Sequence, residues 1–133
     1  MVWHRRTSRN MIGELVLANT SHFNTGQSNP LFKLRPVLII GQADPSEFTA
    51  LPCSTISNKT FVDKIYDIEL CPKSLPLTKL MRPCYIRVHK SVIINRRSID
   101  SRLSNIKVSY PDLFLEILVL FEEYNKKLVL NAL

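Results

Sequence analysis

Residues 35–41 (R-P-V-L-I-I-G) constrain the fold more than any other segment of the chain. The segment is a continuous run of β-branched residues and leucine. Its proline stands near the start, where a strand tolerates proline. An uninterrupted apolar run of this kind is typical of a strand whose two faces are both covered. The sequence therefore predicts a strand here that is buried on both faces.

Several shorter strands are predicted around this one. They are separated by turn signals such as Asp44-Pro45-Ser46 and by a polar loop at 56–64. Residues 20–34 are rich in Ser, Asn and Thr and predict a long loop, and loops of that length are typically functional or disordered. Residues 71–80 contain two prolines and predict a connection that holds at most a short strand. The spacing is typical of a barrel or sandwich; the further strands are expected at 14–19, 48–54, 65–70, 85–88 and 92–94.

The end of the chain changes from strand to helix periodicity. Pro111 suits a first helical turn, and Asp112 is favourable near a helix N-terminus. These signals predict a helix over 111–130. Leu115, Val119 and Leu120 widen its apolar face beyond one stripe, so we expect it either to lie deep in the domain or to form a dimer contact. The apolar residues at helical spacing are Phe114, Ile117, Leu118, Phe121, Tyr124 and Leu128.

The 133 residues suit a single domain, which we place at 11–133 after a basic N-terminal arm at 1–10. No apolar core follows the arm, and no stretch is long enough to span a bilayer, so neither a signal peptide nor a membrane segment is expected. The three cysteines and three histidines are scattered, which predicts reduced thiols, a cytoplasmic protein and neither a metal nor another cofactor.

The formal net charge is +7 and the sequence pI is about 9.6. A domain this basic attracts polyanions, of which nucleic acid is the commonest. The alternative is that the charge serves only solubility.

Cleavage of RNA without a metal needs a group that takes the 2′-OH proton, help for the leaving 5′-oxygen and stabilisation of the phosphorane. Arginine suits the last role because its fork matches two phosphate oxygens. Arg35 stands where the long loop enters the buried strand. Strand alternation turns Ser54 outward if Leu51 and Cys53 point inward, but Ala50 and Phe48 share the parity of Ser54, so the orientation stays open.

Four segments resemble the MazF/PemK family in order and spacing. Residues 35–40 (R-P-V-L-I-I) resemble its K/R-R-P-V-L-V-I segment, and 13–16 (G-E-L-V) its opening strand. Residues 51–55 (L-P-C-S-T) are similar to its V-P-I-T-S strand. Residues 85–88 (Y-I-R-V) are similar to the strand before its D-Q-I-R-T-I-D segment. With the helical tail, the resemblance covers roughly 12–127.

The resemblance implies a fold that is mainly β with a C-terminal helix, a small SH3-like barrel of the MazF/PemK/CcdB type that is usually a homodimer. It implies a toxin that cuts single-stranded mRNA at specific sequences and is neutralised by a cognate antitoxin. The family's catalytic arginine falls on Arg35 and its catalytic threonine on Ser54, with Thr55 as the alternative.

The family's RNA contacts fall on the long loop, here Phe23, Asn24, Gln27 and Lys33. Phe23 could stack on bases or fasten the loop to the core. The basic residues Arg82, Arg87 and Lys90 could hold phosphates or form a solvated edge.

Two departures separate this chain from the pattern. Serine replaces threonine at the catalytic position, and residues 89–95 (H-K-S-V-I-I-N) do not reproduce D-Q-I-R-T-I-D. His89 replaces the acidic residue and is a candidate for acid–base chemistry or for a structural role. Two other function classes remain: a non-catalytic nucleic-acid- or peptide-binding SH3-like module, and a gyrase-directed toxin.

Overall fold

The computed structural model describes residues 10–20 and 33–133. Asn10 is therefore the one residue of the expected basic arm that falls within the described chain. The strands are β1 (Glu14–Asn19), β2 (Leu34–Asp44), β3 (Glu47–Ser54), β4 (Asp67–Leu70), β5 (Cys84–Arg87), β6 (Val92–Asn95) and β7 (Ile99–Asn105). The helices are α2 (Ile106–Ser109) and α3 (Pro111–Ala132), with 3₁₀ turns η2 (Lys59–Phe61), η3 (Pro76–Thr78), η4 (Val88–Lys90) and η5 (Arg96–Ser98). The prediction of a mainly β chain with a C-terminal helix is confirmed.

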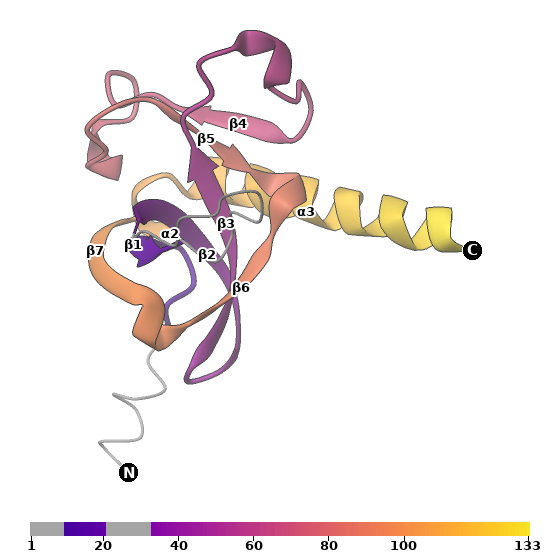
Figure 1. Cartoon of the computed structure of the whole chain (residues 1–133), viewed down its shortest axis with the longest axis horizontal. Helices are drawn as coiled ribbons and strands as arrows, with labels where there is room; N and C mark the ends of the chain where they lie inside the picture. Colours follow the sequence, from indigo (N-terminus) through magenta and orange to yellow (C-terminus); the bar gives the residue numbers. More distant parts are fainter. Residues whose placement is uncertain (1–9, 21–32) are drawn as a thin grey trace.

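All strand pairs are antiparallel, and the sheet order is β4-β5-β3-β2-β1-β7. Strand β3 has different partners along its length. Its first half, Glu47 to Ala50, also pairs with β6, whereas Cys53 and Ser54 at its end pair with β5. Among the described strands no ladder joins β4 to β7, so the sheet is open. The exchange of partners bends the sheet around β3, which Figure 1 shows as a long strand running through the middle of the molecule.

Strand β2 is buried on both faces, as its sequence predicted. Val37 and Ile39 belong to one apolar cluster, and Leu38 and Ile40 belong to another. The first cluster also contains Val16, Phe48 and Ile94, and the second contains Leu15, Leu51, Ile86, Phe114 and Ile117. The same division explains the open question about β3: both parities of that strand are buried, because Phe48 and Ala50 face one cluster and Leu51 and Cys53 the other.

Helix α3 covers the second cluster with one face only. Phe114 and Ile117 are buried, and Leu118, Leu120 and Phe121 pack partly buried against the same cluster. Leu115 and Val119, which widen the apolar face, are exposed. The C-terminal half of the helix extends beyond the strands (Figure 1), so the helix does not lie deep in the domain.

The main differences from the predicted strands are at β7 and at the start of β4. Strand β7 was not predicted. The strand expected from residue 65 begins only at Asp67, because the Asp63 carboxylate accepts hydrogen bonds from the backbone N–H groups of Ile65 and Tyr66 and closes a turn there. Residues 71–80 form the predicted connection, which contains the 3₁₀ turn η3 and no strand.

Gly13 joins three elements at the start of β1. Its N–H donates to the carbonyl of Ile39 in β2 at 2.8 Å, and its carbonyl accepts from the N–H of Ile106 in α2 at 2.8 Å. Its φ is +92°, and a Cβ atom at this position would lie 2.5 Å from Cβ of Lys107. Glycine is required here because a side chain would be both strained and too close to α2.

Candidate nucleic-acid interface

Arg35 and Ser54 lie on adjacent strands, at the start of β2 and at the end of β3. The antiparallel β2–β3 register pairs Val37 with Pro52. Arg35 lies two residues before Val37, and Ser54 lies two residues after Pro52, so both stand at the same end of this strand pair. Both residues are half-buried. Both also line two separate cavities, so they lie between them. The structure thus brings together the arginine and the hydroxyl that the sequence singled out.

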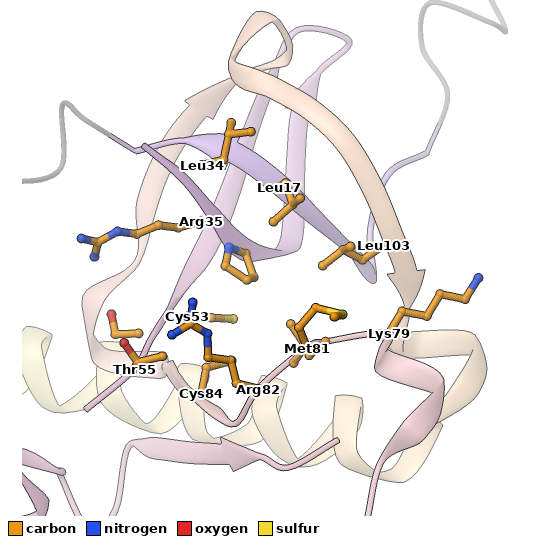
Figure 2. Close-up of a pocket in the computed structure, with 13 residues that line it drawn as sticks. Leu17, Leu34, Arg35, Cys53, Thr55, Lys79, Met81, Arg82, Cys84 and Leu103 are labelled. Atoms are coloured by element: carbon orange, nitrogen blue, oxygen red, sulfur yellow. The ribbon is translucent and has the colours of Figure 1, made fainter. Parts of the chain in front are cut away.

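The first cavity has a volume of about 450 Å³. In Figure 2, Arg82 extends into this cavity, whereas Arg35 and Lys79 point outward from it. Thr55 lies on the same side as Arg82 in this view. The floor and rim are apolar, with contributions from Leu17, Leu34, Pro36, Leu80, Met81 and Leu103.

The second cavity has a volume of about 490 Å³ and lies on the other side of Arg35 and Ser54. It gathers Arg87, His89 and Lys90 from the end of β5 and the turn η4. Thr20, Pro52, Ser91 and Val92 complete its lining.

The two cavities are positively charged. Arg35, Lys79 and Arg82 line the first, and Arg35, Arg87 and Lys90 line the second. Within the described chain, neither lining contains an Asp or Glu side chain. Such clefts concentrate anions, and arginine in particular matches the geometry of phosphate oxygens.

A buried carboxylate, that of Asp67, binds the guanidinium of Arg87 in the wall of the second cavity. The side chain of Asp67 is fully buried. Its Oδ1 atom accepts from Nε of Arg87 at 3.0 Å and its Oδ2 atom from Nη2 of Arg87 at 3.4 Å. Asp67 Oδ2 also accepts from the backbone N–H of Asp63 at 2.7 Å. This two-point contact fixes the plane of the Arg87 guanidinium while leaving about a quarter of the side chain exposed.

His89 lies against the same carboxylate and between two aromatic rings. Its Nδ1 atom is buried, makes no hydrogen bond within the described chain, and lies 3.8 Å from Oδ1 of Asp67. The ring centroid is 5.9 Å from that of Tyr66 and 6.2 Å from that of Tyr124 on α3. Helix α3 therefore helps to hold the histidine in place.

Burial lowers the pKa of His89 below its ordinary value of 6.5. Asp67 and Asp63 act in the opposite direction, and Arg87 and Lys90 reinforce the lowering. The net direction is downward, so at neutral pH the imidazole is uncharged. An uncharged imidazole can accept a proton.

The first cavity also contains two neighbouring thiols, Cys53 and Cys84. All three cysteines of the chain are free thiols. A hydrogen bond with Cys84, together with burial, raises the pKa of the Cys53 thiol well above its ordinary value. A thiol in that state is not a nucleophile, because the thiolate is the reactive form.

Sequence reasoning found some of these residues and missed others. The structure gathers Arg35, Ser54, Thr55, Arg82, Arg87, His89 and Lys90 around the two cavities. Lys33 is exposed and lines neither cavity, while Phe23, Asn24 and Gln27 lie outside the described residues.

The residues missed are Asp67, Tyr66 and Tyr124. Asp67 is directly opposite Arg87 in the β4–β5 register. An opposite-charge pair on neighbouring predicted strands was therefore the available signal, but the register was not known.

Within the described chain, no three His, Cys, Asp or Glu side chains are grouped so as to hold a metal ion. None of the described helices is long and apolar enough to cross a membrane. A scan of protein-family models matches none of them to this chain, and a search of curated proteins gives no match either.

Proposed function

We propose that this chain is an endoribonuclease of the MazF/PemK type that cuts single-stranded RNA without a metal. One observation carries the proposal: Arg35 and Ser54 lie together between two basic cavities whose described linings hold no carboxylate. A strand of RNA passing from one cavity to the other would place a phosphate at this junction. The resemblance of four ordered segments to the family supports the same activity.

The proposal includes the family's fold and biological role. The bending of the sheet where β3 exchanges β6 for β5 supports a small SH3-like barrel. The role is that of the toxin in a cytoplasmic toxin–antitoxin pair. The antitoxin would present an anionic segment to the same basic cavities and so exclude RNA.

The chemistry is a transfer of the phosphodiester within the RNA. The 2′-oxygen attacks phosphorus, the bond to the 5′-oxygen breaks, and the products are a 2′,3′-cyclic phosphate and a 5′-hydroxyl. Uncharged His89 takes the 2′-OH proton, and the departing 5′-oxygen takes a proton from water. Arg35 holds the non-bridging oxygens as charge develops on them, and the Ser54 hydroxyl donates a hydrogen bond to the phosphate.

The sharpest test of this chemistry uses a substrate altered at one atom. A cleaved RNA oligonucleotide is compared with the same oligonucleotide carrying a single 2′-deoxy sugar on the 5′ side of the cut. The proposal expects cyclic-phosphate and 5′-hydroxyl ends on the first and no cut at that position on the second. Cleavage of the 2′-deoxy oligonucleotide at the same bond would contradict 2′-OH attack.

Two other results would favour the alternatives. RNA that is bound and never cut would favour a non-catalytic binding module. RNA that is neither bound nor cut, with an effect on DNA supercoiling, would favour a gyrase-directed toxin.

A further inference from the structure

One ring nitrogen of His89 lacks the partner that a buried polar atom ordinarily has. Its Nδ1 atom is buried and makes no hydrogen bond to any described residue. Buried polar atoms are nearly always hydrogen-bonded, so an unpaired one calls for an explanation. A carboxylate oxygen, Oδ1 of Asp67, lies 3.8 Å from Nδ1. That distance is too long for a hydrogen bond, but the two side chains are buried enough for the electrostatic interaction between them to be strong.

This carboxylate decides which nitrogen of the uncharged imidazole carries the proton. A neutral imidazole has one N–H group and one nitrogen with a free lone pair. A lone pair on Nδ1 would face the negative charge of Asp67, whereas an N–H group at the same place is attracted to it. The proton is therefore held on Nδ1, and Nε2 keeps its lone pair. A neutral histidine side chain in water favours the opposite tautomer, so the fold reverses an intrinsic preference.

Two tyrosine rings hold the imidazole against rotation. The rings of Tyr66 and Tyr124 meet edge to face, with centroids 5.0 Å apart, and each also lies beside the ring of His89. The backbone fastens Tyr66 to the same turn, because its carbonyl accepts from the N–H of Val88 at 3.0 Å. Half a turn of the imidazole would exchange the places of its two nitrogens, and this packing opposes such a turn.

The same arrangement makes Nε2 the nitrogen that is accessible from the second cavity. His89 lines this cavity, and 11% of its side chain is exposed. Because Nδ1 is buried, the nitrogen that can meet a ligand there is Nε2. Asp67 cannot turn away from the ring, because both of its oxygens accept hydrogen bonds from Arg87.

We propose that the Asp67 carboxylate and the two tyrosine rings hold His89 in the Nδ1–H tautomer and present Nε2 to the second cavity as a proton acceptor. These three residues are positioning residues, because they act through the histidine. That the accepted proton comes from the RNA 2′-OH rests on the proposed function.

The proton transfer makes use of both ring nitrogens. When Nε2 takes the proton, the imidazolium carries an N–H group on each nitrogen, and Nδ1–H faces Asp67. The carboxylate thus stabilises the positive charge as it forms. Solvent then removes the proton from His89, which replaces the proton that water gives to the departing 5′-oxygen.

The tautomer can be measured in the full chain without RNA. Nitrogen-15 NMR of histidine-labelled protein distinguishes a protonated ring nitrogen from an unprotonated one, and comparison with His89→Gln assigns the signals. In neutral solution the wild type should show His89 as a single tautomer with its proton on Nδ1. Asp67→Asn should shift the proton toward Nε2, because the neutral amide no longer attracts the Nδ1–H group.

Tyr124 provides a second variant that leaves the buried Asp67–Arg87 pair intact. Tyr124→Leu frees the imidazole to rotate, so both tautomers should appear, whereas Tyr124→Phe keeps the ring and should restore the single wild-type signal. Phe121→Leu is the matched control, an aromatic loss three residues earlier on the same helix, and it should leave the tautomer unchanged. Circular dichroism confirms that every variant is folded.

Cleavage of RNA supplies a separate readout. Tyr124→Leu should lower kcat by about tenfold or more with little change in KM, because the base is misdirected while the cations that hold RNA remain. The loss should stay below that of His89→Gln, since removing a general base costs about 10²–10⁴-fold. Phe121→Leu should cut at the wild-type rate.

Two NMR results would overturn the proposal, whether or not the chain cuts RNA. The first is a wild type with the His89 proton on Nε2. The second is a tautomer that neither Asp67→Asn nor Tyr124→Leu changes. The expected tautomer together with RNA that stays intact would support the orienting contacts and contradict the proposed function.

Discussion

The guanidinium of Arg87 contacts both carboxylate oxygens of Asp67, with Nε–Oδ1 at 3.0 Å and Nη2–Oδ2 at 3.4 Å, while the Asp67 side chain is fully buried. A buried carboxylate is stable only when it is paired and hydrogen-bonded. The pair therefore has two roles at once. It fixes a cation in the wall of the second cavity, and it neutralises the charge beside His89.

Arg87→Met should lower the free energy of unfolding by about 1–3 kcal/mol, because it leaves the Asp67 carboxylate buried without its main donor. Chemical denaturation measures the change. Arg97→Met, at an exposed arginine outside both cavities, is the control and should be close to neutral. The double variant Asp67→Asn/Arg87→Met should cost less than the two single changes added together. Simple additivity would mean that the two side chains do not depend on each other.

His89 should make stability depend on pH near neutrality. Its pKa is lower in the folded chain than its ordinary value of 6.5. The unfolded chain therefore binds the proton first as pH falls. Stability should decrease as the solution is acidified from 6.5 toward the folded pKa, and His89→Gln should lose this component. Thermal melts across mildly acidic pH measure it, and equal slopes for wild type and variant would contradict it.

If uncharged His89 is the base, the rate of RNA cleavage should also depend on the protonation state of His89. The rate should decline as pH falls through the folded pKa of His89, since the protonated imidazole cannot accept the 2′-OH proton. His89→Gln should be slow at every pH and should lack this acidic limb. A variant with an unchanged pH profile would remove His89 from the chemistry.

The position of Ser54 predicts which hydroxyl matters. Ser54 lines both cavities, whereas Thr55 is exposed and lines only the first. Ser54→Ala should slow cleavage by about 10²-fold or more, in the range seen when a hydrogen bond to developing charge is removed. Ser54→Thr should keep activity, and Thr55→Ala is the matched control with a small effect. A larger loss at Thr55 than at Ser54 would reverse the assignment.

Gly13→Ala should destabilise the fold by about 1–3 kcal/mol through backbone strain, and by more if α2 cannot shift away from the new methyl group. Gly41→Ala is the comparison: a Cβ atom there would lie 3.3 Å from Cβ of Thr49, and the Gly41 backbone is not in the left-handed region. The loss at Gly41 should therefore be smaller. Equal losses at the two glycines would show that the φ of Gly13 is not the cause.

Much of the β-structure could be predicted because its strands have a local pattern of apolar residues that is typical of a strand. The run in β2 is apolar on both parities, and β1 was predicted with its observed bounds. Strand β7 (I-D-S-R-L-S-N) is mostly polar and does not carry a clear alternation. It is held by pairing with β1, and by contacts of Arg102 and Asn105 with the buried carboxylate of Glu14. Those contacts span more than 80 residues of sequence and leave no local signal.

The candidate site likewise contains residues that the sequence predicted and residues whose role depends on strand pairing. Arg35 and Ser54 were found through residue chemistry and family resemblance, but their place between two cavities depends on the β2–β3 register. In the sequence, Asp67 is one polar residue within a predicted strand, and nothing local sets it apart. Its role depends on the β4–β5 pairing and on the turn η4, which bring Arg87 and His89 to it.

The proposed metal-independent cleavage of RNA depends most directly on Arg35. The direct measurement incubates a long single-stranded RNA in EDTA with the wild type, with Arg35→Ala and with Arg97→Ala, and maps every new 5′ end. We predict discrete cuts by the wild type and by Arg97→Ala, and none by Arg35→Ala although it still binds the RNA. Intact RNA in all three reactions, with folded and antitoxin-free protein, would contradict the claim, and so would undiminished cutting by Arg35→Ala.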